Sequence, residues 1–179
     1  MHQDLQKILL NSEQIATRVK ELGDEITRDY KGESVLMVAI LRGAVVFFAD
    51  LVKSVDLDVR FDFMVVSSYG SSSTSSGEVR IVKDISQPIE GKNVILVEDI
   101  IDTGNTLKNL KKMLLTRNPK SLKIASLLDK PSRRKVEIEG DYVGFEVPNE
   151  FVVGYGLDYA EKYRNLPEIG VLKPEIYTE

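Results

Sequence analysis

The chain has 179 residues, of which 42% are hydrophobic and 29% charged, and its formal net charge is −4. These values predict one soluble globular domain that buries about 70% of its unfolded surface, and no apolar run approaches the ~20 residues of a membrane span. Because the chain is slightly acidic, it offers no general surface for polyanions. We therefore expect neither nucleic acid nor a membrane among its partners.

The residue types available for chemistry are restricted. The chain has no cysteine, which excludes disulfides, thiol nucleophiles and cysteine-ligated zinc. Its one histidine, His2, lies at a terminus that is expected to fray, so histidine acid/base catalysis is not expected. Catalysis would then depend on carboxylates, Lys, Arg, Tyr, backbone amides and a hard metal ion. The polar start, Met-His-Gln-Asp-Leu, lacks the pattern of a signal peptide, and we expect a cytoplasmic protein.

The first predicted element is an amphipathic helix. The segment 11–14, Asn-Ser-Glu-Gln, has the composition of a helix start, with Asn11 or Ser12 as the cap. The helix is expected to end near residues 30–32, and we interpret it as scaffold. Apolar residues recur along it at three- and four-residue spacing, at Ile15, Val19, Leu22 and Ile26.

A buried strand is predicted from Val35 to Ile40, followed by the turn Leu-Arg-Gly-Ala at 41–44 and a helix over 45–54. A basic residue beside glycine, as at Arg42 and Gly43, can present both charge and bare backbone to an anion. Arg-Gly is also common in ordinary turns, which is the preferred interpretation of this dipeptide alone.

A third strand is predicted from Phe61 to Val66, and a tract rich in Ser and Gly follows it, over residues 67–77. The composition of this tract is typical of a flexible linker. A further short strand is expected at 78–83, however, so the tract would be a long loop inside one domain. Loops of that length are usually functional or disordered.

The chemistry is most concentrated in the stretch 94–106, Val-Ile-Leu-Val-Glu-Asp-Ile-Ile-Asp-Thr-Gly-Asn-Thr. Its first four residues predict a strand buried on both faces, and ligands of open α/β sheets bind where such strands end, here at Glu98 and Asp99. The loop 102–106 precedes a helical pattern, so its N–H groups can hold a phosphate at a helix N-terminus. The arrangement predicts a receptor for a phosphorylated sugar, although an isolated Glu-Asp pair before a glycine turn is more often structural.

Three more buried strands are predicted, over 121–128, 142–147 and 151–155. The first ends in the charged turn 129–134, which contains Lys130. A turn with four charges is typical of a solvated surface, although a lysine at this sheet edge could donate to a carbonyl oxygen. Phe151 by itself would be assigned to the core.

The stretch 94–106 closely resembles the diphosphate-sugar signature of the purine phosphoribosyltransferases, in their hypoxanthine-guanine branch. The segment 151–159, Phe-Val-Val-Gly-Tyr-Gly-Leu-Asp-Tyr, is similar to the purine-binding segment of that family. The resemblance runs from about Leu5 to Val171. It implies an α/β protein with the type I phosphoribosyltransferase fold: a single domain over 1–179, with a mostly parallel central sheet flanked by helices. It also implies a small hood formed by the terminal segments, including about 142–170, and a mobile lid at about 67–78, with Ser68 and Tyr69 as its matching dipeptide.

The resemblance implies a phosphoribosyl diphosphate site in which the Leu41–Arg42 peptide bond is cis. Members of the family often have Lys where this chain has Arg42. The implied metal ion is Mg²⁺, with Mn²⁺ as a substitute, near Glu98, Asp99 and Asp158. The residues implied to bind phosphoribosyl diphosphate are Arg42, Gly43, Glu98, Asp99, Asp102, Thr103, Gly104, Asn105, Thr106 and Arg164.

The resemblance also implies a purine site. Phe151 would stack on the base, Lys130 would contact its 6-oxo group, and Asp102 would take the N7 proton as general base. Backbone carbonyls near Val152 and Asp158 would read the 2-position. The sequence does not determine the direction in which these carbonyl groups point, so it does not rank hypoxanthine, guanine and xanthine as substrates.

The implied activity is purine salvage: a 6-oxopurine and phosphoribosyl diphosphate give IMP or GMP and pyrophosphate, in a homodimer or homotetramer. A regulator that keeps the pocket as a sensor is an alternative, and base-handling residues such as Lys130 and Phe151 argue against it. A phosphatase or receiver domain would also use acids at strand ends. It ranks last because the chain lacks a matching Asp-x-Asp arrangement.

Overall fold

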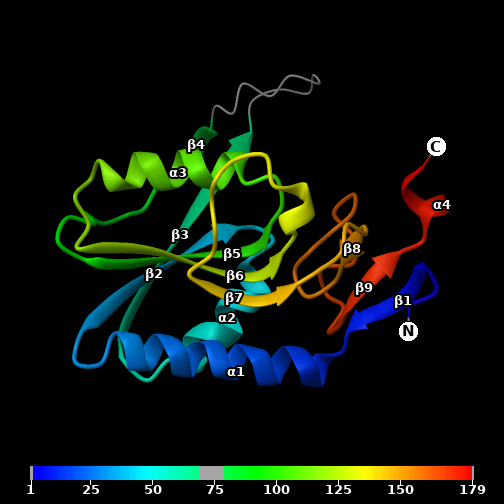
Figure 1. The fold of residues 1–179 in the computed structure, drawn as a ribbon, viewed down its shortest axis with the longest axis horizontal. Coiled ribbons are helices and arrows are strands. Elements are labelled where there is room, and N and C mark those ends of the chain that lie inside the picture. The colour runs from blue at the N-terminus through cyan, green and yellow to red at the C-terminus, as the bar shows by residue number, and fades with distance from the viewer. Residues whose placement is uncertain (1, 69–78, 179) are drawn as a thin grey trace.

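The computed structural model describes residues 2–68 and 79–178. Within them, six strands form the main sheet, in the order β4-β3-β2-β5-β6-β7 (Figure 1). All neighbours are parallel except β3 and β4, so the expected mostly parallel sheet is confirmed. The strands are β2 (Ser34–Leu41), β3 (Asp58–Ser68), β4 (Val79–Lys83), β5 (Asn93–Ile101), β6 (Ser121–Asp129) and β7 (Tyr142–Glu146).

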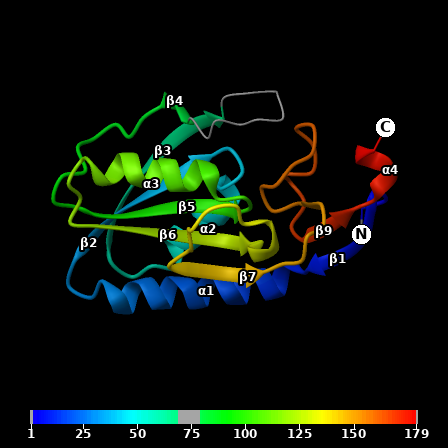
Figure 2. The same cartoon turned by 45° about the horizontal axis from the view of Figure 1, so that its top comes forward.

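Helices cover both faces of this sheet. The helices α1 (Ser12–Asp29) and α2 (Val45–Lys53) pack on one face, and α3 (Asn105–Leu115) packs on the other (Figure 2). Successive residues of β5 alternate between the two cores, with Ile95 and Val97 facing α1 and α2, and Val94 and Leu96 facing α3. Burial on both faces explains why the strand reads as an unbroken apolar run.

The helix α1 starts where its sequence predicts, and a capping box fixes its N-terminus. The Asn11 side chain accepts a hydrogen bond from Gln14 N at 2.8 Å, and the Gln14 side chain accepts one from Asn11 N at 2.9 Å. Asn11 is therefore the cap, and the helix ends at Asp29 with Tyr30 as its C-cap, next to the expected end at residues 30–32.

A second, three-stranded sheet contains both ends of the chain, in the order β1-β9-β8. The strands β1 (Leu5–Leu10), β8 (Val152–Val153) and β9 (Ile169–Leu172) are antiparallel, and the short helices η1 (Pro131–Arg133) and α4 (Pro174–Tyr177) lie near it. The sheet faces the carboxyl ends of the main parallel strands (Figure 2). It therefore lies where ligands of such sheets bind.

Two expectations about these elements need correction. The strand predicted over 151–155 is reduced to β8 because the backbone turns at Gly154 and Tyr155, whose φ angles are 100° and 50°. The strands β1 and β9 were not expected, since each becomes recognisable only through its partner. Among the described residues, no helix is long and apolar enough to cross a membrane.

Candidate active site

Two half-buried carboxylates, Glu98 and Asp99, follow the buried part of β5. Burial raises the pKa of the Glu98 carboxyl well above its ordinary value, and the adjacent Asp99 raises it further. Burial also raises the pKa of Asp99, against the opposing effect of the hydrogen bonds that it accepts. Within residues 2–68 and 79–178, no basic side chain forms an ion pair with either group. Two adjacent carboxyl groups are hard oxygen donors, which fit a divalent cation or sugar hydroxyls.

The loop after β5 turns sharply into α3. Gly104 is the N-cap of α3 and adopts a left-handed conformation, with φ 84°. A Cβ atom at this position would lie 2.4 Å from Ile138 Cγ2, so the loop conformation requires glycine. The loop encloses a cavity of about 260 Å³, which also contains the two carboxylates. The predicted residues on its lining are Glu98, Asp99, Asp102, Thr103, Gly104 and Thr106. Asn105 is absent from that lining.

Behind the loop lie two basic residues that sequence analysis did not assign to the site. Arg134 Nη1 donates to the carbonyl oxygens of Ile101 and Asp102, at 3.2 and 2.6 Å, and Lys135 N donates to Thr103 O at 3.0 Å. These bonds engage three consecutive carbonyl groups of the loop, and neither Arg134 nor Lys135 lines the cavity. Arg134 and Lys135 therefore support the loop, and the only sequence signal for Arg134 was the cluster of charges in the turn 129–134.

The second cavity, of about 370 Å³, contains the predicted base-binding residues. Lys130 is buried, and its Nζ atom donates to Glu150 O at 2.7 Å. Burial lowers the pKa of its ammonium group, more than the nearby Asp102 carboxylate raises it. Phe151 lies against Tyr177 of α4, with ring centroids 4.7 Å apart and nearly parallel rings. The lining residues are Ile100, Asp102, Lys130, Arg133, Asn149, Glu150, Phe151, Val152, Leu157, Asp158 and Tyr177.

The two cavities share Ile100 and Asp102. Oδ1 of Asp102 accepts a hydrogen bond from Arg133 Nε at 2.9 Å. Arg133, Ile100 and Tyr177 were not among the predicted site residues. Ile100 belongs to the stretch 94–106, whereas Arg133 and Tyr177 lie at the site through tertiary packing, and no local pattern distinguishes these two.

The turn 41–44 lies against Asp99. The Leu41–Arg42 peptide bond is cis, as the resemblance implies. A Cβ atom at Gly43 would come within 1.6 Å of Asp99 Oδ2, so only glycine allows this approach. Arg42 is largely exposed and forms an ion pair with Glu161 at 2.5 Å.

Asp158 and Arg164 pair with each other at 2.9 Å. Asp158 also accepts a hydrogen bond from Glu161 N at 2.9 Å. In the part of the chain that the structure describes, no three His, Cys, Asp or Glu side chains are arranged to hold a metal ion. The structure therefore does not gather Asp158 with Glu98 and Asp99 in one cluster. Of the lid dipeptide, Ser68 ends β3, and Tyr69 lies outside the described residues, as do most of residues 67–78.

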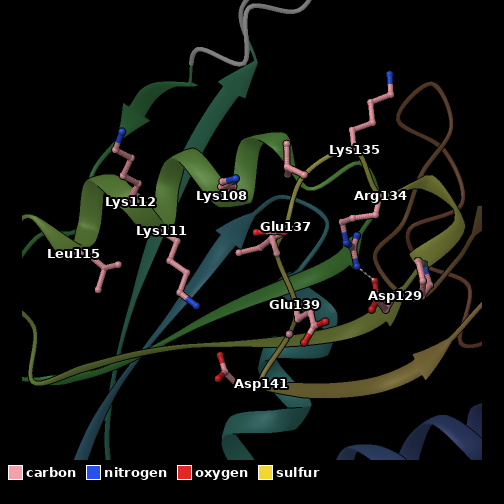
Figure 3. Close-up of a pocket in the computed structure, with 14 residues that line it drawn as sticks. Lys108, Lys111, Lys112, Leu115, Asp129, Arg134, Lys135, Glu137, Glu139 and Asp141 are labelled. Carbon is pink, nitrogen blue, oxygen red and sulfur yellow. Dashed lines mark hydrogen bonds and ion pairs between the residues drawn. The ribbon is translucent and has the colours of Figure 1, made fainter.

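A larger groove, of about 1200 Å³, lies between α3 and the segment 134–141 (Figure 3). Lysines of α3, including Lys108 and Lys111, line one side, and Glu137 and Glu139 line the other. The groove has no aromatic side chain, and none of the predicted site residues lines it. One wall of this groove is the segment whose residues Arg134 and Lys135 support the loop 102–106, and the predicted site residues line the two smaller cavities instead.

Comparisons with known proteins agree with this geometry. Residues 6–160 match the family model described as phosphoribosyl transferase domain. Over 179 residues the chain is 56% identical to a hypoxanthine-guanine phosphoribosyltransferase of Streptococcus thermophilus, covering 100% of this chain and 99% of that protein. It is also 56% identical, over 100% of its own length, to a bifunctional protein TilS/HprT of Listeria monocytogenes, of which it spans only 28%.

Solved structures give the same result. A hypoxanthine phosphoribosyltransferase of Staphylococcus aureus superposes with a TM-score of 0.97 at 52% identity, covering 100% of this chain and 97% of that one. A hypoxanthine phosphoribosyltransferase of Trypanosoma cruzi superposes with a TM-score of 0.94 at 45% identity, covering 98% of this chain and 100% of that one. The chain therefore belongs to the phosphoribosyltransferase family and has its type I fold.

Proposed function

We propose that this chain transfers the 5-phosphoribosyl group of phosphoribosyl diphosphate to hypoxanthine or guanine in purine salvage, giving IMP or GMP and pyrophosphate. The observation that carries the proposal is the junction of two cavities at Ile100 and Asp102. One cavity contains a phosphate loop and two carboxylates, and the other contains an aromatic ring and a buried lysine. A nucleoside monophosphate, with its base and ribose joined by one bond, requires two such adjoining sites.

The reaction breaks the bond between the ribose anomeric carbon and the diphosphate oxygen, and forms a bond from that carbon to a purine nitrogen. Positive charge develops on the sugar, and negative charge on the leaving group. Backbone amides near Gly43 and the Arg164 guanidinium would stabilise the departing pyrophosphate, while N–H groups of the loop 102–106 would hold the 5′-phosphate. Catalysis in this proposal is mainly electrostatic.

Asp102 is the proposed general base for the purine N7 proton. It lines both cavities, so its carboxylate borders the base and the sugar at once. Arg133 engages Oδ1, which leaves the second carboxylate oxygen to accept the proton.

Lys130 is the proposed determinant of base class. Its ammonium group can only donate hydrogen bonds, and one of its three N–H bonds is directed to Glu150 O. The others suit the 6-oxo group of hypoxanthine or guanine, whereas the 6-amino group of adenine would leave a buried donor unpaired. Sites that use hydrogen bonds in this way discriminate by large factors. Phe151 would stack on the base, and backbone carbonyls near Val152 and Asp158 would read its 2-position.

Mg²⁺ is the proposed cofactor, with Mn²⁺ as a substitute. Glu98 and Asp99 would hold it together with the ribose hydroxyls and the diphosphate oxygens, and Asp158 would contribute through water. When bound, such an ion neutralises charge that develops on the diphosphate. The hard oxygen donors of the two adjacent carboxyl groups, which line one cavity with the loop, support this assignment.

Several finer features belong to the same proposal. One domain would comprise the sheet, a lid at about 67–78 and a base-binding hood that includes about 142–170. The protein would act in the cytoplasm as a homodimer or homotetramer. Its partners would be phosphoribosyl diphosphate, a 6-oxopurine, pyrophosphate and the nucleoside monophosphate, with no nucleic acid or membrane.

The decisive experiment incubates the protein with phosphoribosyl diphosphate, Mg²⁺ and one of hypoxanthine, guanine, xanthine or adenine. Formation of nucleotide and pyrophosphate is followed for each base. We expect turnover with hypoxanthine or guanine and little with adenine. Adenine as the best substrate would overturn the role of Lys130, and no turnover with any purine would favour a phosphoribosyl diphosphate sensor.

A further inference from the structure

The two segments proposed to bind the diphosphate meet through bare backbone. A Cβ atom at Gly43 would lie 1.6 Å from Asp99 Oδ2, and a Cβ atom at Gly156 would lie 2.2 Å from Gly43 O. Asp99, the turn 41–44 and the loop at Gly156 therefore form a stack with no side chain between its layers. Such a stack allows close approach, but it has little to fix the relative position of its layers.

A partly buried hydrogen bond, one residue along the chain from Gly156, joins these segments. The Tyr155 hydroxyl donates to Oδ2 of Asp50 at 2.5 Å, and Tyr155 is 7% exposed. Asp50 belongs to α2, which begins directly after the turn 41–44. Burial and this hydrogen bond raise the pKa of the Tyr155 hydroxyl, so it remains a donor throughout the neutral range.

Backbone hydrogen bonds also join Tyr155 and Gly156 to the segment 164–166, which contains Arg164. Tyr155 N donates to Leu166 O at 2.8 Å, and Gly156 N donates to Arg164 O at 3.0 Å. The Arg164 guanidinium in turn donates to Gly156 O at 2.8 Å. A displacement of Tyr155 would therefore move both Gly156 and Arg164 relative to Gly43.

We infer that the Tyr155–Asp50 hydrogen bond is a positioning device for the diphosphate site, which sets the distance between the turn at Gly43 and the Arg164 guanidinium. Tyr155 and Asp50 are positioning residues, since neither lines the two cavities of the site. The inference rests on the proposed function, because it assumes that these two segments bind diphosphate. Loss of the Tyr155–Asp50 hydrogen bond should weaken diphosphate binding and leave base binding intact.

The test compares Tyr155→Phe with a matched variant, Tyr142→Phe. Tyr142 is 3% exposed, and its hydroxyl donates to Asp29 of α1 at 2.7 Å, so the control removes the same kind of bond. Binding of inorganic pyrophosphate with Mg²⁺ is measured by calorimetry. We expect Tyr155→Phe to weaken it about tenfold, the factor for loss of a hydrogen bond to a charged group. The control should bind as the wild type does.

Kinetics provide the second measurement. The KM for phosphoribosyl diphosphate should rise about tenfold in Tyr155→Phe, while the KM for hypoxanthine changes by less than about twofold. Asp50→Leu should raise the KM for phosphoribosyl diphosphate by the same factor as Tyr155→Phe, and the double variant should raise it no further. Asp50→Asn keeps an oxygen acceptor, so its KM should lie between that of Asp50→Leu and that of the wild type.

Unchanged pyrophosphate affinity in Tyr155→Phe would overturn the inference, as would equal losses for diphosphate and base. Equal effects of the Tyr155 and Tyr142 variants would assign both bonds to general stability and also overturn it. If the wild-type chain neither binds pyrophosphate nor converts any purine, the proposed function fails and this inference with it. A wild type that does both, beside an unaffected Tyr155→Phe, refutes the inference alone.

Discussion

Arg133 Nε lies 2.9 Å from Oδ1 of Asp102, and this hydrogen bond orients the carboxylate at the junction of the two cavities. Asp102→Asn retains an oxygen that can accept from Arg133, so the loop should keep its shape. We expect turnover to fall by about 10² or more, the scale of lost general base catalysis. Steady-state kinetics measure the loss, and pyrophosphate binding serves as the control. Near-normal turnover of hypoxanthine and guanine would remove Asp102 from the role.

Lys130 should give the reaction an alkaline limit. Because burial lowers its pKa, the ammonium group should lose its proton at a lower pH than the ordinary value of 10.5. Turnover should then decline as the pH rises through this pKa, and Lys130→Gln should be slow but lack that decline. The measurement is kcat/KM for hypoxanthine against pH.

Unfolding does not explain such a decline. A lysine whose pKa is lowered on folding binds fewer protons in the folded state than in the unfolded state. Its contribution to the free energy of unfolding therefore rises with pH between the folded and unfolded pKa values. Thermal unfolding at each pH separates the two effects. A melting temperature that falls in parallel with turnover would contradict the assignment to Lys130.

Gly43→Ala should disrupt the diphosphate site. The new Cβ atom would lie 1.6 Å from Asp99 Oδ2, so the turn or the carboxylate must move. We expect pyrophosphate affinity and turnover to fall by at least about tenfold, since a displacement of about 1 Å can cost 10²-fold. Gly32→Ala is the control, because its φ of 81° is unfavourable for alanine but no atom lies within 4 Å. It should reduce stability by about 1 kcal/mol and leave affinity unchanged.

Removal of divalent cations should abolish turnover and leave the fold intact. Glu98 and Asp99 would hold the ion together with diphosphate oxygens, so the ion belongs to the substrate complex and not to the scaffold. The experiment adds a chelator, records the far-UV circular dichroism spectrum and then restores Mg²⁺ or Mn²⁺. Full activity after exhaustive chelation would refute the metal assignment. Loss of the helix and strand signal from that spectrum after chelation would show that the ion is needed for folding.

Sequence predicted best where local pattern determines structure. The apolar run Val94–Val97 predicted a strand buried on both faces, and the segment 11–14 predicted a helix start capped by Asn11 or Ser12. A loop at 102–106 that leads directly into a helix was predicted because a helical pattern follows glycine and small polar residues, and its phosphate-binding role stays a prediction. The grouping of Lys130, Phe151 and Val152 around one cavity followed from the family resemblance, since no local pattern links them.

The missed features depend on contacts between distant residues. Arg134 supports the loop through carbonyl groups some 30 residues earlier, as its hydrogen bonds to Ile101 and Asp102 show. Tyr177 lies at the base cavity because α4 packs beside Phe151. In both cases the residue type fits an ordinary surface position, and only the tertiary arrangement gives it a role.

The pairing of β1 with β9 has a consequence for the order in which the site is made during synthesis. The strands of the main sheet lie between Ser34 and Glu146, whereas the smaller sheet requires Leu5 to pair with Leu172. Proteins are made from the N-terminus, so the phosphate loop and its sheet emerge from the ribosome before β9 exists. The cavity lined by Lys130 and Phe151 should therefore close last, through the longest-range strand pairing among the described residues, and a nascent chain that stops before residue 169 would contain the loop 102–106 without that finished cavity.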